Sequence, residues 1–72
     1  MERIKNRVKE GRFFEKKTQL DLSIKTGIDH ATISRIERGY QIPSESQKIK
    51  LAKALNRDIA WLFPEDTEGN YD

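Results

Sequence analysis

The segment 30–38 places hydrogen-bonding side chains on one side of a predicted helix. On a wheel of about 100° per residue, Ile33, Ile36 and Glu37 share the opposite side. The outward side and the N-terminal tip carry the small residue Ala31 and the hydrogen-bonding residues His30, Thr32, Ser34, Arg35 and Arg38. A guanidinium binds two acceptors at once, as on a phosphate or a guanine edge. The segment therefore predicts a helix that two isoleucines anchor and that presents a surface to an anionic, hydrogen-bonding partner.

The sequence holds no set of residues that predicts catalysis. It contains no cysteine and a single histidine, His30, whereas a zinc site needs about three or four protein ligands. There is no glycine-rich phosphate loop, and no serine or carboxylate has an evident base or orienting partner. We therefore expect no catalytic residues, no metal site, no cofactor and no small-molecule ligand, and we expect that the protein is not an enzyme.

A second short helix is predicted before the segment 30–38. Thr18 and Asp21 have the spacing of a capping box, in which a hydroxyl is followed three residues later by an acid. We expect a helix from Gln19 to about Lys25 with Leu22 inward, ended by Gly27 in the left-handed conformation.

The turn that follows completes a recognisable pattern. Asp29 offers a carboxylate cap to the helix 30–38, and Gly39 can end that helix. Two short helices joined by a tight glycine-containing turn are typical of a helix-turn-helix, here over residues 18–38. The second helix of such a unit fits the major groove of DNA.

The remaining segments also predict helices, which gives an all-α bundle of about five short helices. A first helix is expected from Arg3 to Phe14, and a fourth is expected after a capping box at Ser44 and Gln47. In the first helix, Ile4, Val8 and Arg12 form one stripe, and Gly11 lies inside the helix. The fourth helix should run to about Leu55, with Ile49, Ala52 and Leu55 on one face, and end at Asn56. A last helix is expected over 59–63, capped by Asp58 and closed by Pro64. Residues 65–72 are acidic and without periodicity, so we expect a domain over 1–64 and a disordered tail.

Charge is distributed unevenly along the chain. Residues 1–57 carry all 14 Lys and Arg with 7 acids, a net charge of +7, and residues 58–72 carry the other 5 acids and no base. A basic body with an acidic end suits a polyanionic partner. No apolar run approaches the roughly 20 residues of a membrane span, and the N-terminus lacks the apolar stretch of a signal peptide. We expect a soluble, cytoplasmic protein that does not associate with membranes.

These motifs together resemble the lambda-repressor-like Cro/CI family, also called XRE, over about residues 3–63. The matching residues are Thr18-Gln19, Leu22, Lys25-Thr26-Gly27-Ile28, the run Thr32 to Gly39, Pro43-Ser44 and the run Leu51 to Leu55. The resemblance implies a transcriptional regulator, most often a repressor, that binds double-stranded operator DNA in a sequence-specific manner. It also implies a homodimer that forms through the region of Trp61, Leu62 and Phe63. These apolar side chains could instead fill the core, which we expect of Leu62.

The resemblance also implies residue roles. Gln19 would contact a phosphate or a neighbouring base, and Arg12 would pair with Glu37 as a structural ion pair. Base contacts are expected from His30, Ala31, Ser34 and Arg35, and phosphate contacts from Thr32, Arg38 and Tyr40. Lys17 is expected to help with phosphates because of its charge alone, and a solvated loop residue is the alternative. Ala31 could contact a thymine methyl or could simply be small enough for close approach, and both readings stay open.

The sequence departs from the family pattern at several places. Lys16 and Lys17 replace a glycine and an apolar residue, and Phe13 and Phe14 are expected to supply the lost apolar contact. Ser23 replaces an alanine where the two helices approach closely. Glu45 and Lys48 replace leucines, which thins the core or leaves an unusual surface.

Other functions within this fold stay open at the level of sequence. A helix-turn-helix can serve as a protein-interaction module, such as an antitoxin or adaptor, because fold does not settle function. An activator is a further alternative, and so are phage, toxin–antitoxin and restriction-control settings. The outward side of the helix 30–38 favours DNA, since an adaptor would tend to show apolar residues there.

Overall fold

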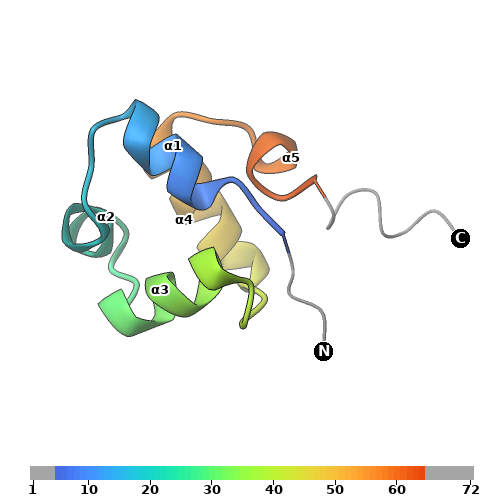
Figure 1. Ribbon diagram of the computed structural model, residues 1–72, viewed down its shortest axis with the longest axis horizontal. Coiled ribbons are helices and arrows are strands. Elements are labelled where there is room, and N and C mark those ends of the chain that lie inside the picture. The colour runs from blue at the N-terminus through green and yellow to red at the C-terminus, as the bar shows by residue number, and fades with distance from the viewer. Residues whose placement is uncertain (1–4, 65–72) are drawn as a thin grey trace, which may run out of the picture.

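The computed structural model describes residues 5–64, and all of the regular structure in that range is helical (Figure 1). The elements are α1 (Val8–Phe14), α2 (Gln19–Thr26), α3 (His30–Arg38), α4 (Glu45–Leu55) and α5 (Ile59–Leu62). The predicted all-α bundle of five short helices is therefore confirmed. The expectations for Arg3, Ile4 and the acidic tail 65–72 lie outside the described residues.

The helices enclose one small hydrophobic core. α4 contacts α1, α2 and α5, and α3 contacts both α1 and α2. In Figure 1, α1 and α4 occupy the centre, with α2 and α5 at opposite sides and α3 along the lower edge. The buried apolar residues are Val8, Leu22, Ile28, Ile33, Ile36, Leu51, Ala54, Leu55, Leu62 and Phe63. Among residues 5–64, none of the helices has the length and hydrophobicity of a membrane-spanning segment.

The caps of α2 and the glycine after it are as predicted. The Asp21 backbone N–H donates to Thr18 Oγ1 at 3.0 Å, and the Thr18 N–H donates to Asp21 Oδ2 at 2.9 Å. These two bonds satisfy backbone donors that the first turn of a helix leaves free. Gly27 ends α2 with φ of 75°, in the left-handed region that glycine occupies without steric cost.

The bounds of α3 are also as predicted. Asp29 Oδ2 accepts from the Ala31 N–H at 3.1 Å, and Gly39 ends the helix with φ of 83°. The turn between α2 and α3 has hydrogen bonds of its own. Ser23 Oγ donates to the Ile28 carbonyl at 2.7 Å, and Thr26 Oγ1 donates to the Leu22 carbonyl and accepts from the Ile28 N–H.

The prediction that the first helix extends from Arg3 is wrong within the described residues, because residues 5–7 are not helical and α1 begins at Val8. Asn6 Oδ1 accepts from the Val8 N–H at 3.0 Å, while Asn6 Nδ2 donates to the Ile36 carbonyl at 2.8 Å. The Arg7 N–H donates to the Leu62 carbonyl at 2.7 Å. These bonds to α3 and α5 hold the segment before Val8 in a non-helical path.

The expected role of Phe13 and Phe14 in the core is wrong. Both rings face solvent, with 59% and 64% of their surface exposed. The loop before α2 is held instead by two hydrogen bonds between Arg12 and Lys17. The Arg12 side chain donates from Nη1 to the Lys17 carbonyl at 3.2 Å, and the Lys17 N–H donates to the Arg12 carbonyl at 2.9 Å. Lys16 adopts a left-handed φ of 57°, which is the conformation that a glycine at this position would take most easily.

The predicted capping box at Ser44 and Gln47 opens α4, and Asn56 ends it in the left-handed conformation. Of the predicted inward face, Leu55 is buried and Ala52 packs partly buried against the core, but the prediction is wrong for Ile49, which is 42% exposed. The buried stripe runs through Lys48, Leu51 and Leu55, at spacings of three and four that follow the helical period. Lys48 covers the core with its aliphatic stem, and its Nζ lies 3.9 Å from Glu45 Oε1.

The last helix is shorter than predicted. α5 ends at Leu62 with Phe63 as its C-cap residue, and Asp58 occupies the N-cap position without a side-chain cap bond. Leu62 is buried in the core, as expected, and so is Phe63. Of the three apolar residues in this region, only Trp61 remains partly exposed.

Candidate nucleic-acid interface

α3 presents the two sides that the helical wheel predicts. Ile33 and Ile36 are fully buried and fix the helix to the core. The residues of the outward side and the tip are exposed or half-buried: His30, Ala31, Arg35 and Arg38 are exposed, and Thr32 and Ser34 are half-buried. α3 follows the left-handed turn at Gly27 and lies along the lower edge of the bundle in Figure 1.

Arg35 is held at the middle of the outward side by two side chains. Its Nε donates to Gln41 Oε1 at 2.8 Å and its Nη2 donates to Thr32 Oγ1 at 3.1 Å. A guanidinium has five N–H groups, so about three remain for a ligand. Gln41 was not identified from the sequence, since it lies in the loop after α3 and only the folded loop brings it to Arg35.

A buried ion pair lies behind α3. Arg12 Nε donates to Glu37 Oε2 at 2.7 Å and Arg12 Nη2 donates to Glu37 Oε1 at 3.1 Å. These are the two residues that the resemblance paired. Only 10% of the Arg12 side chain and 4% of the Glu37 side chain are exposed. Both charges are therefore shielded from water and depend on each other.

The ion pair continues into a series of hydrogen bonds that reaches the tip of α3. Gln19 Nε2 donates to Glu37 Oε1 at 3.0 Å, and Gln19 Oε1 lies 2.9 Å from His30 Nε2. We call Arg12, Glu37, Gln19 and His30 the polar chain. Gln19 is half-buried and both ends of its amide are occupied, so its main effect within the protein is to orient His30.

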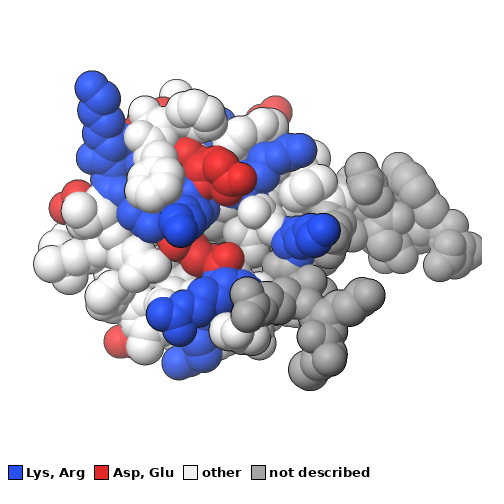
Figure 2. Space-filling view, viewed as in Figure 1, with Lys and Arg blue, Asp and Glu red and all other residues white. Residues whose placement is uncertain are grey.

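The other predicted phosphate-binding residues flank α3. Tyr40 is exposed and its N–H donates to the Arg35 carbonyl at 2.9 Å. Lys17 is half-buried in the loop before α2, where its carbonyl accepts from Arg12. Arg38 is exposed in the last turn of α3. Figure 2 shows Lys and Arg side chains over the lower part of this face, where α3 lies, and over α1, with acidic side chains between them.

One carboxylate near this surface has an altered titration. The Thr18 backbone N–H, and then the Thr18 hydroxyl, stabilise the charged form of Asp21 and lower the pKa of its carboxyl below the ordinary value. The carboxylate therefore stays ionised at neutral pH and complements the N-terminus of α2.

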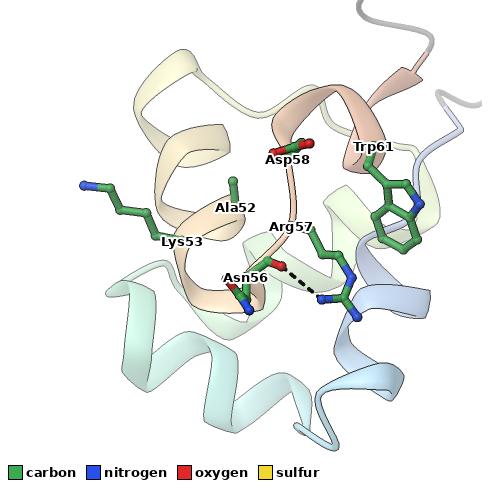
Figure 3. Close-up of a pocket in the computed structure, with 6 residues that line it drawn as sticks. All are labelled: Ala52, Lys53, Asn56, Arg57, Asp58 and Trp61. Carbon is green, nitrogen blue, oxygen red and sulfur yellow. Dashed lines mark hydrogen bonds between the residues drawn. The ribbon is translucent and has the colours of Figure 1, made fainter.

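A hollow of about 380 Å³ lies at the other end of the molecule (Figure 3). Its lining residues are Ala52, Lys53, Asn56, Arg57, Asp58 and Trp61. Arg57 lies beside the Trp61 ring, 5.5 Å from its centroid, and donates to the Asn56 carbonyl at 2.9 Å. None of the lining residues belongs to α2 or α3, so this hollow is separate from the outward side of α3.

Comparison with known proteins identifies the helix-turn-helix that contains α2 and α3. A family model described as helix-turn-helix matches residues 15–62, about two thirds of the chain, which includes α2, the turn and α3. No curated protein and no solved structure gives a match.

Proposed function

Because this chain belongs to the Cro/CI-type helix-turn-helix family of DNA-binding regulators, we propose that it is a transcriptional repressor that recognises a specific double-stranded operator. The observation that carries this proposal is the division of α3. Ile33 and Ile36 hold one side in the core, while Arg35 on the other side keeps free N–H groups at the surface. A rigid helix with this surface suits the major groove, where each base pair presents its own pattern of donors and acceptors.

Within this proposal the residues divide into two groups. His30, Ala31, Ser34 and Arg35 contact base edges, and Arg35 is placed to bind guanine O6 and N7 together. Thr32, Arg38, Tyr40 and Lys17 contact phosphates, which fix the position of the protein on the duplex without selecting sequence. Gln19, whose amide bonds Glu37 and His30, keeps one N–H for a phosphate or a neighbouring base. The exposure of Arg35, Arg38 and Tyr40 supports this division.

We further propose that two copies bind two related half-sites, since a two-fold dimer doubles the length of sequence that is recognised. The partly exposed Trp61 and the exposed Phe14 beside it, 6.3 Å apart between ring centroids, offer an apolar contact surface. Sedimentation at increasing concentration, with and without operator, measures this. A monomer in both conditions would contradict the dimer.

Repression would follow from occupancy, because a protein bound to an operator excludes polymerase from the overlapping promoter. A reporter gene placed behind the selected operator should fall in expression when the protein is supplied. A rise in expression would contradict repression while leaving DNA binding intact.

The proposal is tested by selecting bound fragments from a pool of random duplexes. We expect a short enriched motif, and affinity for any duplex that falls steeply with salt because phosphate contacts release counterions. A protein-interaction module predicts neither the motif nor the salt dependence. Failure to enrich any motif at moderate salt would overturn sequence-specific binding.

A further inference from the structure

The polar chain fixes the orientation of the Gln19 amide. Glu37 accepts hydrogen bonds from Arg12 through both of its oxygens, and a carboxylate has no proton of its own to donate. The Gln19 atom that lies 3.0 Å from Glu37 Oε1 must therefore be the NH₂ group. The carbonyl oxygen of Gln19 is then the atom that faces His30.

This orientation decides which ring nitrogen of His30 carries a proton. Gln19 Oε1 lies 2.9 Å from His30 Nε2, and a carbonyl oxygen accepts but cannot donate. Nε2 therefore carries the proton that lies between them. A neutral imidazole has one N–H, so Nδ1 is left as a hydrogen-bond acceptor. No hydrogen bond joins Nδ1 to another of residues 5–64, and His30 is exposed at the tip of α3.

We infer that the ion pair Arg12–Glu37, acting through Gln19, makes His30 an acceptor that selects a base with an amino group at its major-groove edge. Adenine N6 and cytosine N4 are the donors that bases present there, whereas guanine and thymine present acceptors. The inference rests on the proposed function, because it requires the tip of α3 to lie in the groove. Gln19 and Glu37 act as positioning residues, and His30 is the residue that contacts the base.

The tautomer can be measured without DNA, because His30 is the only histidine in the chain. Nitrogen NMR of the ¹⁵N-labelled protein at pH 8 should show Nε2 protonated and Nδ1 unprotonated. Gln19→Ala should give a mixture of the two tautomers. Gln41→Ala is the matched control, because that glutamine bonds Arg35 and not His30, and it should keep the spectrum of the parent.

Two results would overturn the positioning by Gln19. One is a parent ring with the proton on Nδ1, and the other is the same mixture of tautomers in the parent and in Gln19→Ala. Thermal unfolding of each variant shows whether the fold is retained. If Gln19→Ala proved unstable, Gln19→Met, which keeps the length without the carbonyl, provides the same comparison.

The base selection is measured on duplexes enriched from the random pool. We expect adenine or cytosine at the position where His30→Ala loses its preference. Replacing that base by one without the exocyclic amino group should weaken binding of the parent about 2- to 10-fold, the effect of one hydrogen bond, and should leave His30→Ala unchanged.

Each outcome has a distinct meaning. Guanine or thymine at that position, no position that depends on His30, or no loss when the amino group is removed would overturn the selection. Failure of the parent to bind any duplex would overturn the proposed function together with the selection. The NMR comparison would still decide the tautomer.

Discussion

The two ends of this small bundle hold their charged side chains in different ways. Beside α3, Arg12 and Glu37 form a two-point ion pair with 10% and 4% of their side chains exposed. Near α5, Arg57 contacts Glu15 through a single 3.1 Å contact, with 27% and 31% of these side chains exposed. Arg57 also lies over the rings of Phe14 and Trp61. We call Glu15, Arg57, Phe14 and Trp61 the aromatic cluster.

The difference separates charges that position other groups from charges that mainly cover a surface. A shielded pair has few alternative partners, so it can hold Gln19 and His30 in one arrangement. An exposed pair exchanges its partner for water at little cost. The polar chain therefore supports from behind the surface proposed for DNA. The aromatic cluster covers the contact of α1 with α5 and leaves the Phe14 ring exposed.

Glu37→Ala should have the largest effect on stability. Removing one partner of a shielded pair leaves the other charge uncompensated, which costs about 3 kcal/mol or more. The matched control Glu15→Ala breaks the exposed pair and should cost less than about 1 kcal/mol. Urea unfolding of both variants measures the two losses. Equal losses would contradict the distinction between the two pairs.

The backbone offers a second comparison, between the turn of the helix-turn-helix and the loop after α1. Gly27 has φ of 75°, and a Cβ added there would meet no atom within 4 Å. Gly27→Ala should therefore destabilise through conformation alone, by about 1 to 2 kcal/mol. The shift in the urea midpoint is the readout. A neutral Gly27→Ala would show that the turn does not need a left-handed residue.

Lys16 has nearly the same backbone conformation, with φ of 57°, but carries a side chain. Lys16→Gly should therefore relieve backbone strain in the folded state. Glycine also raises the chain entropy of the unfolded state, which offsets part of this gain, so we expect a net increase in stability of about 0.5 kcal/mol. Thermal unfolding at matched ionic strength measures it. A loss of stability as large as that of Gly27→Ala would show that the Lys16 side chain has contacts that matter more than its backbone.

The smallest expected effect concerns an exposed charge beside the polar chain. Hydrogen bonds from Thr18 lower the pKa of Asp21 in the folded state relative to the unfolded state. Its contribution to stability is therefore present at neutral pH and is lost as pH falls through the folded-state pKa. Carbon NMR of the Asp21 carboxyl should give a midpoint below that of Asp21 in the Thr18→Ala variant. Because alanine keeps the backbone N–H that contributes most to the lowering, the difference between the two midpoints reports the Thr18 hydroxyl. A parent midpoint equal to or above that of Thr18→Ala would contradict the contribution of this hydroxyl.

Local signals predicted the part of the fold that local interactions decide. The caps Thr18 and Asp29 and the left-handed Gly27 and Gly39 act within a few residues, so the bounds of α2 and α3 followed from spacing. The inward position of Ile33 and Ile36 followed from the helical period. In these segments local preference and tertiary packing agree.

Contacts between distant segments decided the rest. α1 begins at Val8 because Asn6 and Arg7 bond to α3 and α5. The exposure of Ile49 depends on which side of α4 packs against α1, α2 and α5. Within the site, Gln19 and His30 are eleven residues apart on different helices, and no local pattern joins them. The sequence could place each polar residue on its element but not identify its hydrogen-bond partner.

The central claim is that the outward side of α3 selects the DNA sequence. The most direct measurement is the ratio of dissociation constants for the selected operator and for a duplex of shuffled sequence. Arg35→Ala should reduce this ratio about tenfold or more, since a two-point contact to guanine gives about 1 to 3 kcal/mol of discrimination. Lys53→Ala, which removes the same charge from an exposed site on α4, should keep the ratio of the parent. An unchanged ratio in Arg35→Ala would contradict the account.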